Sequence, residues 1–268
     1  MSRLSWNRCP DPHGITVQIL VESLSSCAWN THRNGYRCRL KKLRIVPMED
    51  TPPTFAGFTA TQIHTIVHTM NVSPPDSALW AAKLIQSRRT NLPKRLCGPG
   101  PDEHQQRLIL EAAAAAPDHE QILPWRFVEI PSDRRAALGQ AFVDALVERD
   151  PSAGEDDRAQ ARDKALRSPW LLLAVVRTGG PPEEIPASER MLSAGAAVQN
   201  MLLMAAAQGL GSSLTSGKAL NSAALRTLFK LSDQEQALCF LNFGHIRDPR
   251  KERPRPAVDQ YFSRLPPG

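Results

Sequence analysis

Residues 189–217, ERMLSAGAAVQNMLLMAAAQGLGSSLTSG, contain the segment around which we expect the rest of the chain to fold. From residue 191 to residue 207 it carries no charged side chain, and its apolar residues leave no polar stripe at helical spacing. A helix that is apolar on every side is a buried helix. Its length approaches that of a membrane span, but Ala, Gly, Ser, Gln and Asn dilute it, so the pattern favours a core helix of a soluble protein.

Small residues follow the end of this helix. Gly209 is placed to cap the helix in a left-handed conformation. The next segment, LGSSLTSG, is rich in hydroxyl groups, which suits a chain that passes close to a flat or anionic ligand. A dinucleotide-binding Rossmann fingerprint requires a strand before its Gly-rich turn, whereas a helix precedes this one, so we reject that interpretation.

The composition is that of a globular protein with one core or two. The chain has 268 residues, of which 41% are hydrophobic and 22% are charged. Its net charge of +6 is not gathered into a cluster interleaved with aromatic residues, which argues against a nucleic-acid binder. The one dense basic run, RDPRKERPRP at residues 247–256, fits either a solvated arm or a phosphate contact.

Cysteine usage and the N-terminal sequence predict a cytoplasmic protein. The five cysteines are an odd number without a CxxC pair, which is typical of a reducing compartment rather than a disulfide scaffold. The apolar run ITVQILV at residues 15–21 is too short for a signal peptide, and no small-residue cleavage site follows it.

Residues 1–76 lack the periodicity of the rest of the chain. We expect them to be an N-terminal extension that is disordered or not part of the natural protein, with translation starting near Met70. His64 and His68 lie four residues apart, but no glutamate completes an HExxH pattern and no third ligand is evident, so we expect no metal site.

From Asp76 onward, helices and strands alternate. Asp76 or Ser77 can cap the first helix, and the apolar run WLLLAVV indicates a strand buried on both faces. The expected helices cover residues 77–90, 102–116, 133–149, 155–167, 189–208 and 222–231, and the expected strands cover 125–130, 170–176, 212–215 and 237–244. This order predicts one α+β or α/β domain over residues 77–268, with a small sheet wrapped by helices.

Two fragments could bind an anion or a flat ligand. Arg88, Arg89 and Thr90 place two guanidinium groups and a hydroxyl at a helix end, and guanidinium forks match phosphate and carboxylate geometry. The alternative is two solvated arginines favoured by the helix dipole. His119 lies in a loop between two prolines, PDHEQILPW, where a lone histidine more often has no special role.

Taken together, four fragments resemble the nitroreductase family. They are SRRT at residues 87–90, APDHEQILPW at 116–125, SAGAAVQNMLLMAAAQGLGSSLTSG at 193–217 and LNFGHIRDP at 241–249. The order and the spacing are most similar to a compact subgroup of bacterial FMN-dependent NAD(P)H oxidoreductases. The resemblance covers residues 77–262 and leaves the first 76 residues uncovered.

The resemblance implies an α+β, nitroreductase-like fold. In this fold a small mixed, mainly antiparallel sheet is flanked by helices around a buried central helix. Two copies form an intertwined homodimer, and FMN lies at the dimer interface, where both subunits contact it. No nucleic acid and no membrane would be involved.

The resemblance also assigns site residues. Those of the FMN site are Arg88, Arg89, Thr90, Ala115, His119, Leu214, Thr215 and Ser216. The first three would hold the phosphate and ribityl chain, while His119 would reach the flavin of the other subunit. The region assigned to NAD(P)H comprises Met204, Ala205, Ala206, Ala207, Gln208 and Gly209. Lys251 and Arg253 could correspond to a Lys-x-Arg phosphate contact of larger relatives.

Several positions depart from the family pattern. Thr90 replaces serine and keeps the hydroxyl, and Leu123 stands where the subgroup has glutamine. Leu214 and Thr215 replace Trp and Arg, and Ala115 stands where a relative carries Arg. Losing these cations would weaken FMN retention or change the second substrate. Only a short connection joins residues 177 and 189, so no large lid is expected over the pocket.

The implied function is that of a flavin-dependent oxidoreductase. Hydride would pass from NAD(P)H through FMN to a nitroaromatic, a quinone or a similar acceptor, and the flavin, not a protein acid or base, would carry the chemistry. One alternative is a degenerate FMN-binding or dimeric scaffold protein of the same fold without turnover. Another is a basic nucleic-acid binder, whose affinity would fall steeply with salt.

Overall fold

The computed structural model describes residues 74–249 and 254–266, together with four short strands nearer the start of the chain. The chain divides into two units, residues 1–54 and 55–268. In the first unit, β1 (Leu20–Val21) pairs with β4 (Leu43–Arg44), and β2 (Leu24–Ala28) pairs with β3 (Arg37–Leu40), both antiparallel. His64, His68, Lys251 and Arg253 lie outside the described residues.

The second unit contains the elements that the sequence predicts from Asp76 onward. Its helices are α2 (Pro74–Ser87), α3 (Glu103–Ala113), α4 (Arg135–Arg149), α5 (Glu155–Asp163), α6 (Ala187–Ala207) and α7 (Ala223–Leu228). Its strands are β5 (Leu96–Cys97), β6 (Trp125–Glu129), β7 (Trp170–Arg177), β8 (Gly211–Thr215) and β9 (Glu235–Ile246). The short 3-10 turns are η1 (Pro93–Arg95), η2 (His119–Gln121), η3 (Ser132–Arg134), η4 (Lys164–Leu166), η5 (Lys218–Asn221) and η6 (Val258–Gln260).

Strand β9 is the centre of the sheet. It pairs with β7 along one edge and with β8 and β5 along the other, and β6 lies outside β7. All of these pairs are antiparallel, and an isolated parallel bridge joins Thr90 to Ser212 on β8. The prediction of a small, mainly antiparallel mixed sheet is therefore confirmed.

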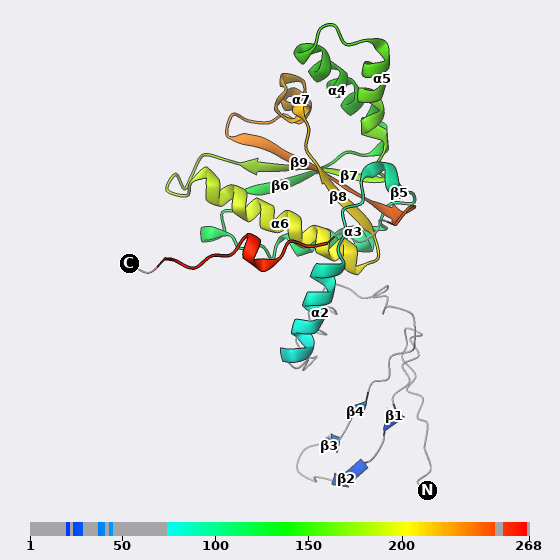
Figure 1. The fold of residues 1–268 in the computed structure, drawn as a ribbon, viewed down its shortest axis with the longest axis vertical. Helices are drawn as coiled ribbons and strands as arrows, with labels where there is room; N and C mark the ends of the chain where they lie inside the picture. Colours follow the sequence, from blue (N-terminus) through cyan, green and yellow to red (C-terminus); the bar gives the residue numbers. More distant parts are fainter. Residues whose placement is uncertain are drawn as a thin grey trace. The chain divides into compact units, whose positions relative to one another are not determined.

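Helices cover both faces of this sheet. Figure 1 shows α3 and α6 on one side and α4, α5 and α7 on the other. Side chains alternate along a strand, and successive residues of β7 enter two separate hydrophobic clusters. Leu172 and Ala174 pack in the cluster that contains α6, whereas Leu171 and Leu173 pack on the opposite face. The prediction that WLLLAVV is buried on both faces is confirmed.

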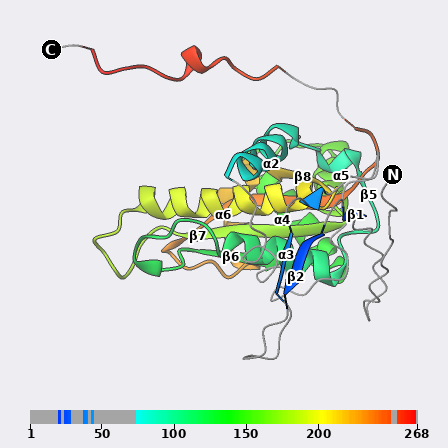
Figure 2. The same cartoon turned by 90° about the horizontal axis from the view of Figure 1, so that it is seen from below.

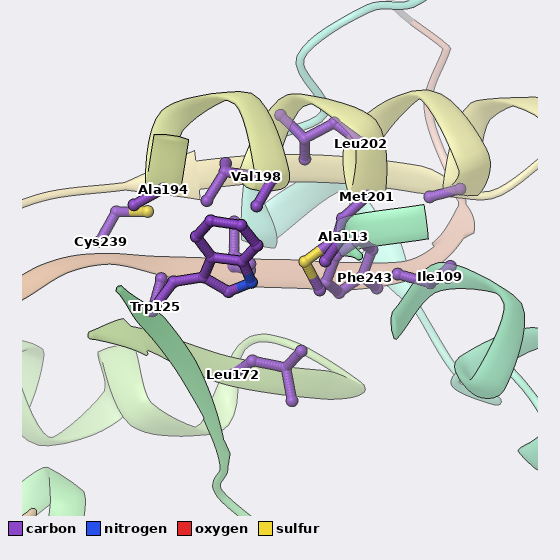
Figure 3. Close-up of a cluster of buried hydrophobic side chains, with 14 of the residues drawn as sticks. Ile109, Ala113, Trp125, Leu172, Ala194, Val198, Met201, Leu202, Cys239 and Phe243 are labelled. Atoms are coloured by element: carbon purple, nitrogen blue, oxygen red, sulfur yellow. The ribbon is translucent and has the colours of Figure 1, made fainter. Parts of the chain in front are cut away.

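Helix α6 lies along β7 and contributes more residues to one core cluster than any other helix (Figure 2). In Figure 3 the ring of Trp125 lies between this helix and the sheet, close to Ala194 and Val198. The α6 side chains that are at most 4% exposed are Arg190, Ala194, Ala197, Val198, Met201, Leu202 and Ala205. The helix is thus central, as the sequence predicts.

One stripe of α6 remains open in the single chain, which differs from the expectation of burial on every side. Leu192 is 75% exposed, and Gly195 and Gln199 are exposed as well. These residues recur every three or four positions, so they lie on one side of the helix. These three residues carry no charge, and Gln199 is the polar side chain among them.

Helices α2 and α3, which precede β6 in the chain, differ in how well the sequence predicts them. Helix α3 starts where the sequence predicts, and Asp102 caps it through a capping box with Gln105. Helix α2 begins at Pro74 rather than at Asp76 or Ser77, because proline fits the first turn of a helix. Its apolar side is not buried in the single chain, where Trp80 is 64% exposed. No described helix is long and apolar enough to cross a bilayer.

Candidate functional site

The end of α2 is attached to the beginning of β8. Thr90 forms a parallel bridge with Ser212, and the backbone N–H of Asn91 donates to the Ser212 carbonyl at 2.9 Å. Arg88 and Arg89, just before the bridge, are partly exposed. The structure therefore brings the predicted phosphate-binding residues to the strand that carries the predicted flavin contacts.

Arg88 is the centre of a cluster of positive charge. Its guanidinium is partly buried, and no carboxylate among the described residues pairs with it. Burial lowers the pKa of Arg88, and the neighbouring charges of Arg255 and Arg89 lower it further. Arg255 donates to the carbonyls of Arg88 at 3.0 Å and Gln86 at 3.3 Å. This geometry is suited to binding an anion, which would neutralise the like charges that repel one another.

Sequence reasoning did not select Arg255. The resemblance to larger relatives with a Lys-x-Arg phosphate contact indicated Lys251 and Arg253, from the same basic run. Within the described residues, Arg255 is the arginine of that run whose guanidinium hydrogen-bonds to the end of α2. The signal that could have found it was the basic run itself, because its phosphate interpretation did not depend on one particular pair of residues.

Strand β8 ends with one apolar and one polar side chain, those of Leu214 and Thr215. Leu214 is 48% exposed, while the hydroxyl of Thr215 accepts a hydrogen bond from Asn242 Nδ2 at 3.1 Å. Asn242 is 3% exposed and also donates to the Ser213 carbonyl at 3.3 Å. Ser216, the next residue, is exposed. The segment thus exposes the apolar side chain of Leu214, while hydrogen bonds from Asn242 hold the strand in place. Asn242 was not identified from the sequence.

The predicted NAD(P)H region, residues 204–209, forms the last turn of α6 and its cap. Gly209 has a φ of 73°, which confirms the predicted left-handed cap, and Leu210 N–H donates to the Ala205 carbonyl at 2.9 Å. Ala205 is fully buried, whereas Ala207 and Gly209 are exposed. No atom lies within 4 Å of where a Cβ on Gly209 would be, so the backbone here is open to a ligand.

His119 lies in a tightly bent loop. Its Nδ1 and Glu189 Oε2 are 2.8 Å apart, and this hydrogen bond is the main cause that raises the pKa of His119. Glu120 and Leu123 have positive φ angles of 55° and 46°, which residues other than glycine rarely adopt. The Asp118 carboxylate accepts a hydrogen bond from Leu123 N–H at 2.8 Å and closes the loop.

The predicted site residues thus form two groups at opposite ends of α6. Gln208, after the helix, donates to the carbonyl of Gln105 near the start of α3, and Glu189, in its first turn, contacts His119 beyond the end of α3. Ala115 is exposed and belongs to the His119 end. A helix of 21 residues is about 30 Å long. One chain therefore does not bring His119 to the Arg88 cluster.

Comparisons with known proteins agree with this fold. The family model "Nitroreductase family" matches residues 95–245, from β5 to β9, which is more than half of the chain. A protein of Haemophilus influenzae named "Putative NAD(P)H nitroreductase" is 33% identical over 164 residues, which are 61% of this chain and 87% of that protein.

Two solved structures have the same fold. The nitroreductase-like family protein from Bacillus cereus has a TM-score of 0.59 at 20% identity and covers 69% of this chain and 95% of its own. The NADPH:FMN oxidoreductase from Vibrio harveyi complexed with NAD+ has a TM-score of 0.52 at 16% identity, covering 68% and 76%. From the family model and the relative of H. influenzae, the chain belongs to the nitroreductase family.

Proposed function

We propose that the protein is an FMN-dependent oxidoreductase that uses NAD(P)H to reduce a small acceptor such as a nitroaromatic or a quinone. Family membership supports this, as do the names of a relative and a neighbour, one an NAD(P)H nitroreductase and the other an NADPH:FMN oxidoreductase complexed with NAD+. The observation that carries the proposal is the charge of Arg88, beside Arg255 and next to β8, with which no carboxylate of the described residues pairs.

The residues near the C-terminal end of α6 have the chemical groups that FMN binding requires. Arg88 and Arg255 would bind its phosphate, and the Thr90 hydroxyl would contact the ribityl chain. The exposed apolar face of Leu214 and the open backbone at Gly209 suit a flat ring that must approach the chain closely. When bound, FMN supplies the hydride and electron transfer, and the protein supplies position and charge.

We further propose that the working form is a homodimer. His119 lies about 30 Å along α6 from the phosphate-binding residues, so it can serve a flavin only if that flavin is bound mainly by another copy. The uncharged stripe of Leu192, Gly195 and Gln199 is the surface that such a copy would cover. Leu192 is 75% exposed in the single chain, and a second copy would bury it.

The proposed location is the cytoplasm. Within the described part of the chain, Cys97 and Cys239 are free thiols, and burial raises the pKa of Cys239 to about 11. A buried thiol of high pKa is unreactive and has no need of an oxidising compartment. Residues 1–76 remain, in this proposal, an N-terminal extension of the flavin-binding domain.

The visible spectrum of the purified full-length protein tests the function. A flavin spectrum that bleaches when NADPH is added without oxygen, and returns with a quinone or a nitroaromatic, is the expected result. A flavin spectrum that neither nicotinamide changes would favour the degenerate FMN-binding alternative, which the loss of an aromatic side chain at Leu214 and of cations at Thr215 and Ala115 motivates. A colourless protein that cannot be reconstituted with FMN would contradict both.

A further inference from the structure

Glu189 is a contact of His119 that the proposed function leaves unexplained. The two residues lie 70 positions apart in the sequence, yet their side chains meet at 2.8 Å. His119 is 58% exposed and Glu189 is 48% exposed, so the pair is in contact with water. Exposed ion pairs contribute little to folding stability, so the main effect of this contact is on the orientation of the two side chains.

The backbone at Glu189 is held in place by the side chain of the next residue, Arg190. Arg190 is only 1% exposed, and its guanidinium donates to three backbone carbonyls of the loop before α6. These are Ile185 at 2.9 Å, Gly180 at 2.6 Å and Pro182 at 2.5 Å. The first turn of α6 is thereby fixed to residues 180–185. Glu189 projects from a turn that cannot shift without breaking these bonds.

The loop of His119 is fixed just as firmly on its other side. Arg177, at the end of β7, donates through its side chain to the Ile122 carbonyl at 2.8 Å and through its backbone to the Pro124 carbonyl at 2.7 Å. With the bond from Leu123 N–H to Asp118, these contacts fix both ends of the bend. The His119–Glu189 contact therefore joins two anchored segments, and it determines the direction of the imidazole ring.

We propose that Glu189 is a positioning residue, which engages Nδ1 of His119 and so presents Nε2 of that ring to the cofactor bound mainly by the second copy. The proposal rests on the proposed function. A histidine nitrogen that is held by a carboxylate sets the role of the other nitrogen, which then faces the ligand. Glu189 would act through His119 and would not itself touch the flavin or its substrates.

The charges around His119 favour its protonated form. The groups that raise its pKa are Glu189, Glu120 and Asp118, all of them acidic, and Glu189 contributes the largest effect. The neighbouring cation, Arg190, has its guanidinium turned to backbone carbonyls. A protonated Nε2–H is a donor, so it suits an acceptor atom or a developing negative charge on the bound cofactor.

The test compares Glu189→Ala and Glu189→Gln with the matched control Glu184→Gln, an exposed carboxylate five residues earlier. Titration of the His119 ring by NMR needs no flavin, and His119→Gln assigns the signal. We expect the pKa of His119 to fall in both Glu189 variants and to remain that of the wild type in the control. An unchanged value in Glu189→Ala would overturn the proposal.

The loaded protein gives the second readout. For NADPH oxidation we expect kcat/KM to fall about 10-fold in Glu189→Ala and less in Glu189→Gln, whose amide oxygen still accepts from Nδ1. Activity that depends on protonated His119 declines as pH rises through its pKa, so that limb should move to lower pH in both variants. An active wild type whose variants keep its kcat/KM and pH profile would overturn the proposal. A wild type without flavin or turnover would instead overturn the proposed function, and the NMR titration would still report whether Glu189 holds His119.

Discussion

Arg88 has a partly buried charge that no carboxylate in the described part of the chain neutralises. We predict that Arg88→Ala and Arg255→Ala each weaken FMN binding, because a hydrogen bond to a charged group contributes about 1.5–3 kcal/mol, or roughly 10- to 150-fold in Kd. Quenching of flavin fluorescence by the apoprotein measures the affinity. Arg107→Ala is the control, since Arg107 is exposed and pairs with Glu111 on α3. Equal Kd values for Arg88→Ala and wild type would contradict the assignment.

Asn242 and Ser213 are adjacent buried residues with opposite predicted effects. Asn242 Nδ2 bonds to Thr215 and to the Ser213 carbonyl, so Asn242→Ala should cost about 1–3 kcal/mol and lower Tm by several degrees. Ser213 Oγ has no hydrogen-bond partner among the described residues, so Ser213→Ala should leave Tm unchanged or raise it. Thermal unfolding followed by circular dichroism distinguishes the two. A Ser213→Ala variant less stable than Asn242→Ala would refute this account of β8.

Glu235 provides a pH-dependent contribution to stability. Arg126 donates to its carboxylate from Nε at 2.6 Å and from Nη2 at 3.2 Å, and this lowers the pKa of Glu235 below its ordinary 4.5. The stabilisation is present above the unfolded pKa and is lost as pH falls through the folded one. The gap in unfolding free energy between wild type and Glu235→Gln should therefore shrink from about pH 6 to about pH 3. Urea titrations measure this gap, and Glu148→Gln controls for the loss of one exposed charge.

At the scale of elements, Arg190 connects α6 to the loop before it. Replacing it by methionine leaves three carbonyls without their donor, which should cost about 1–3 kcal/mol or more. Amide exchange should accelerate in residues 178–190, while the middle of β7 keeps its protection. Arg135→Met is the matched control, because Arg135 is also buried and also bonds to two carbonyls, on the opposite face of the sheet. Faster exchange throughout β7 in Arg190→Met would contradict a local role.

The sequence predicts elements well where the determining forces are local. The apolar run of β7, the start of α3 at Asp102 and the cap at Gly209 after α6 depend on neighbours within a few residues, and all three are confirmed. Strand β9 is longer than expected at both ends, to Glu235 and Ile246, because Glu235 pairs with Arg177 and Ile246 with Leu96.

The site is less predictable because its contacts join distant segments. The bridge from Thr90 to Ser212 and the contact from His119 to Glu189 leave no trace at any fixed spacing in the sequence. Resemblance to a family named Arg88, Thr90 and His119, and the structure adds Arg255, Asn242 and Glu189. The exact partner of a side chain depends on packing that only the fold determines.

At the scale of the whole molecule, the open stripe on α6 should be the contact between copies. Leu192→Glu would place a charge in that contact, so we expect a monomer that has lost its flavin. Leu166→Glu is the control, because Leu166 is 64% exposed on η4, next to α5 and away from α6. Sedimentation gives the mass and the absorbance ratio gives the flavin content. A flavin-loaded dimer of Leu192→Glu would place the contact elsewhere.

The central place of β9 also affects how the protein is made. The strand begins about 60 residues after β7 ends, and the ribosome adds about 5–20 residues per second. For roughly 3 to 12 s, therefore, the nascent chain has an apolar β7 with one edge unpaired, and such edges pair readily with other chains. A message that stopped before Glu235 would keep α6 and most of the site residues but would never supply the central strand, with which β5, β7 and β8 all pair. Its product should aggregate during synthesis, so early termination would yield insoluble chains and no partly active enzyme.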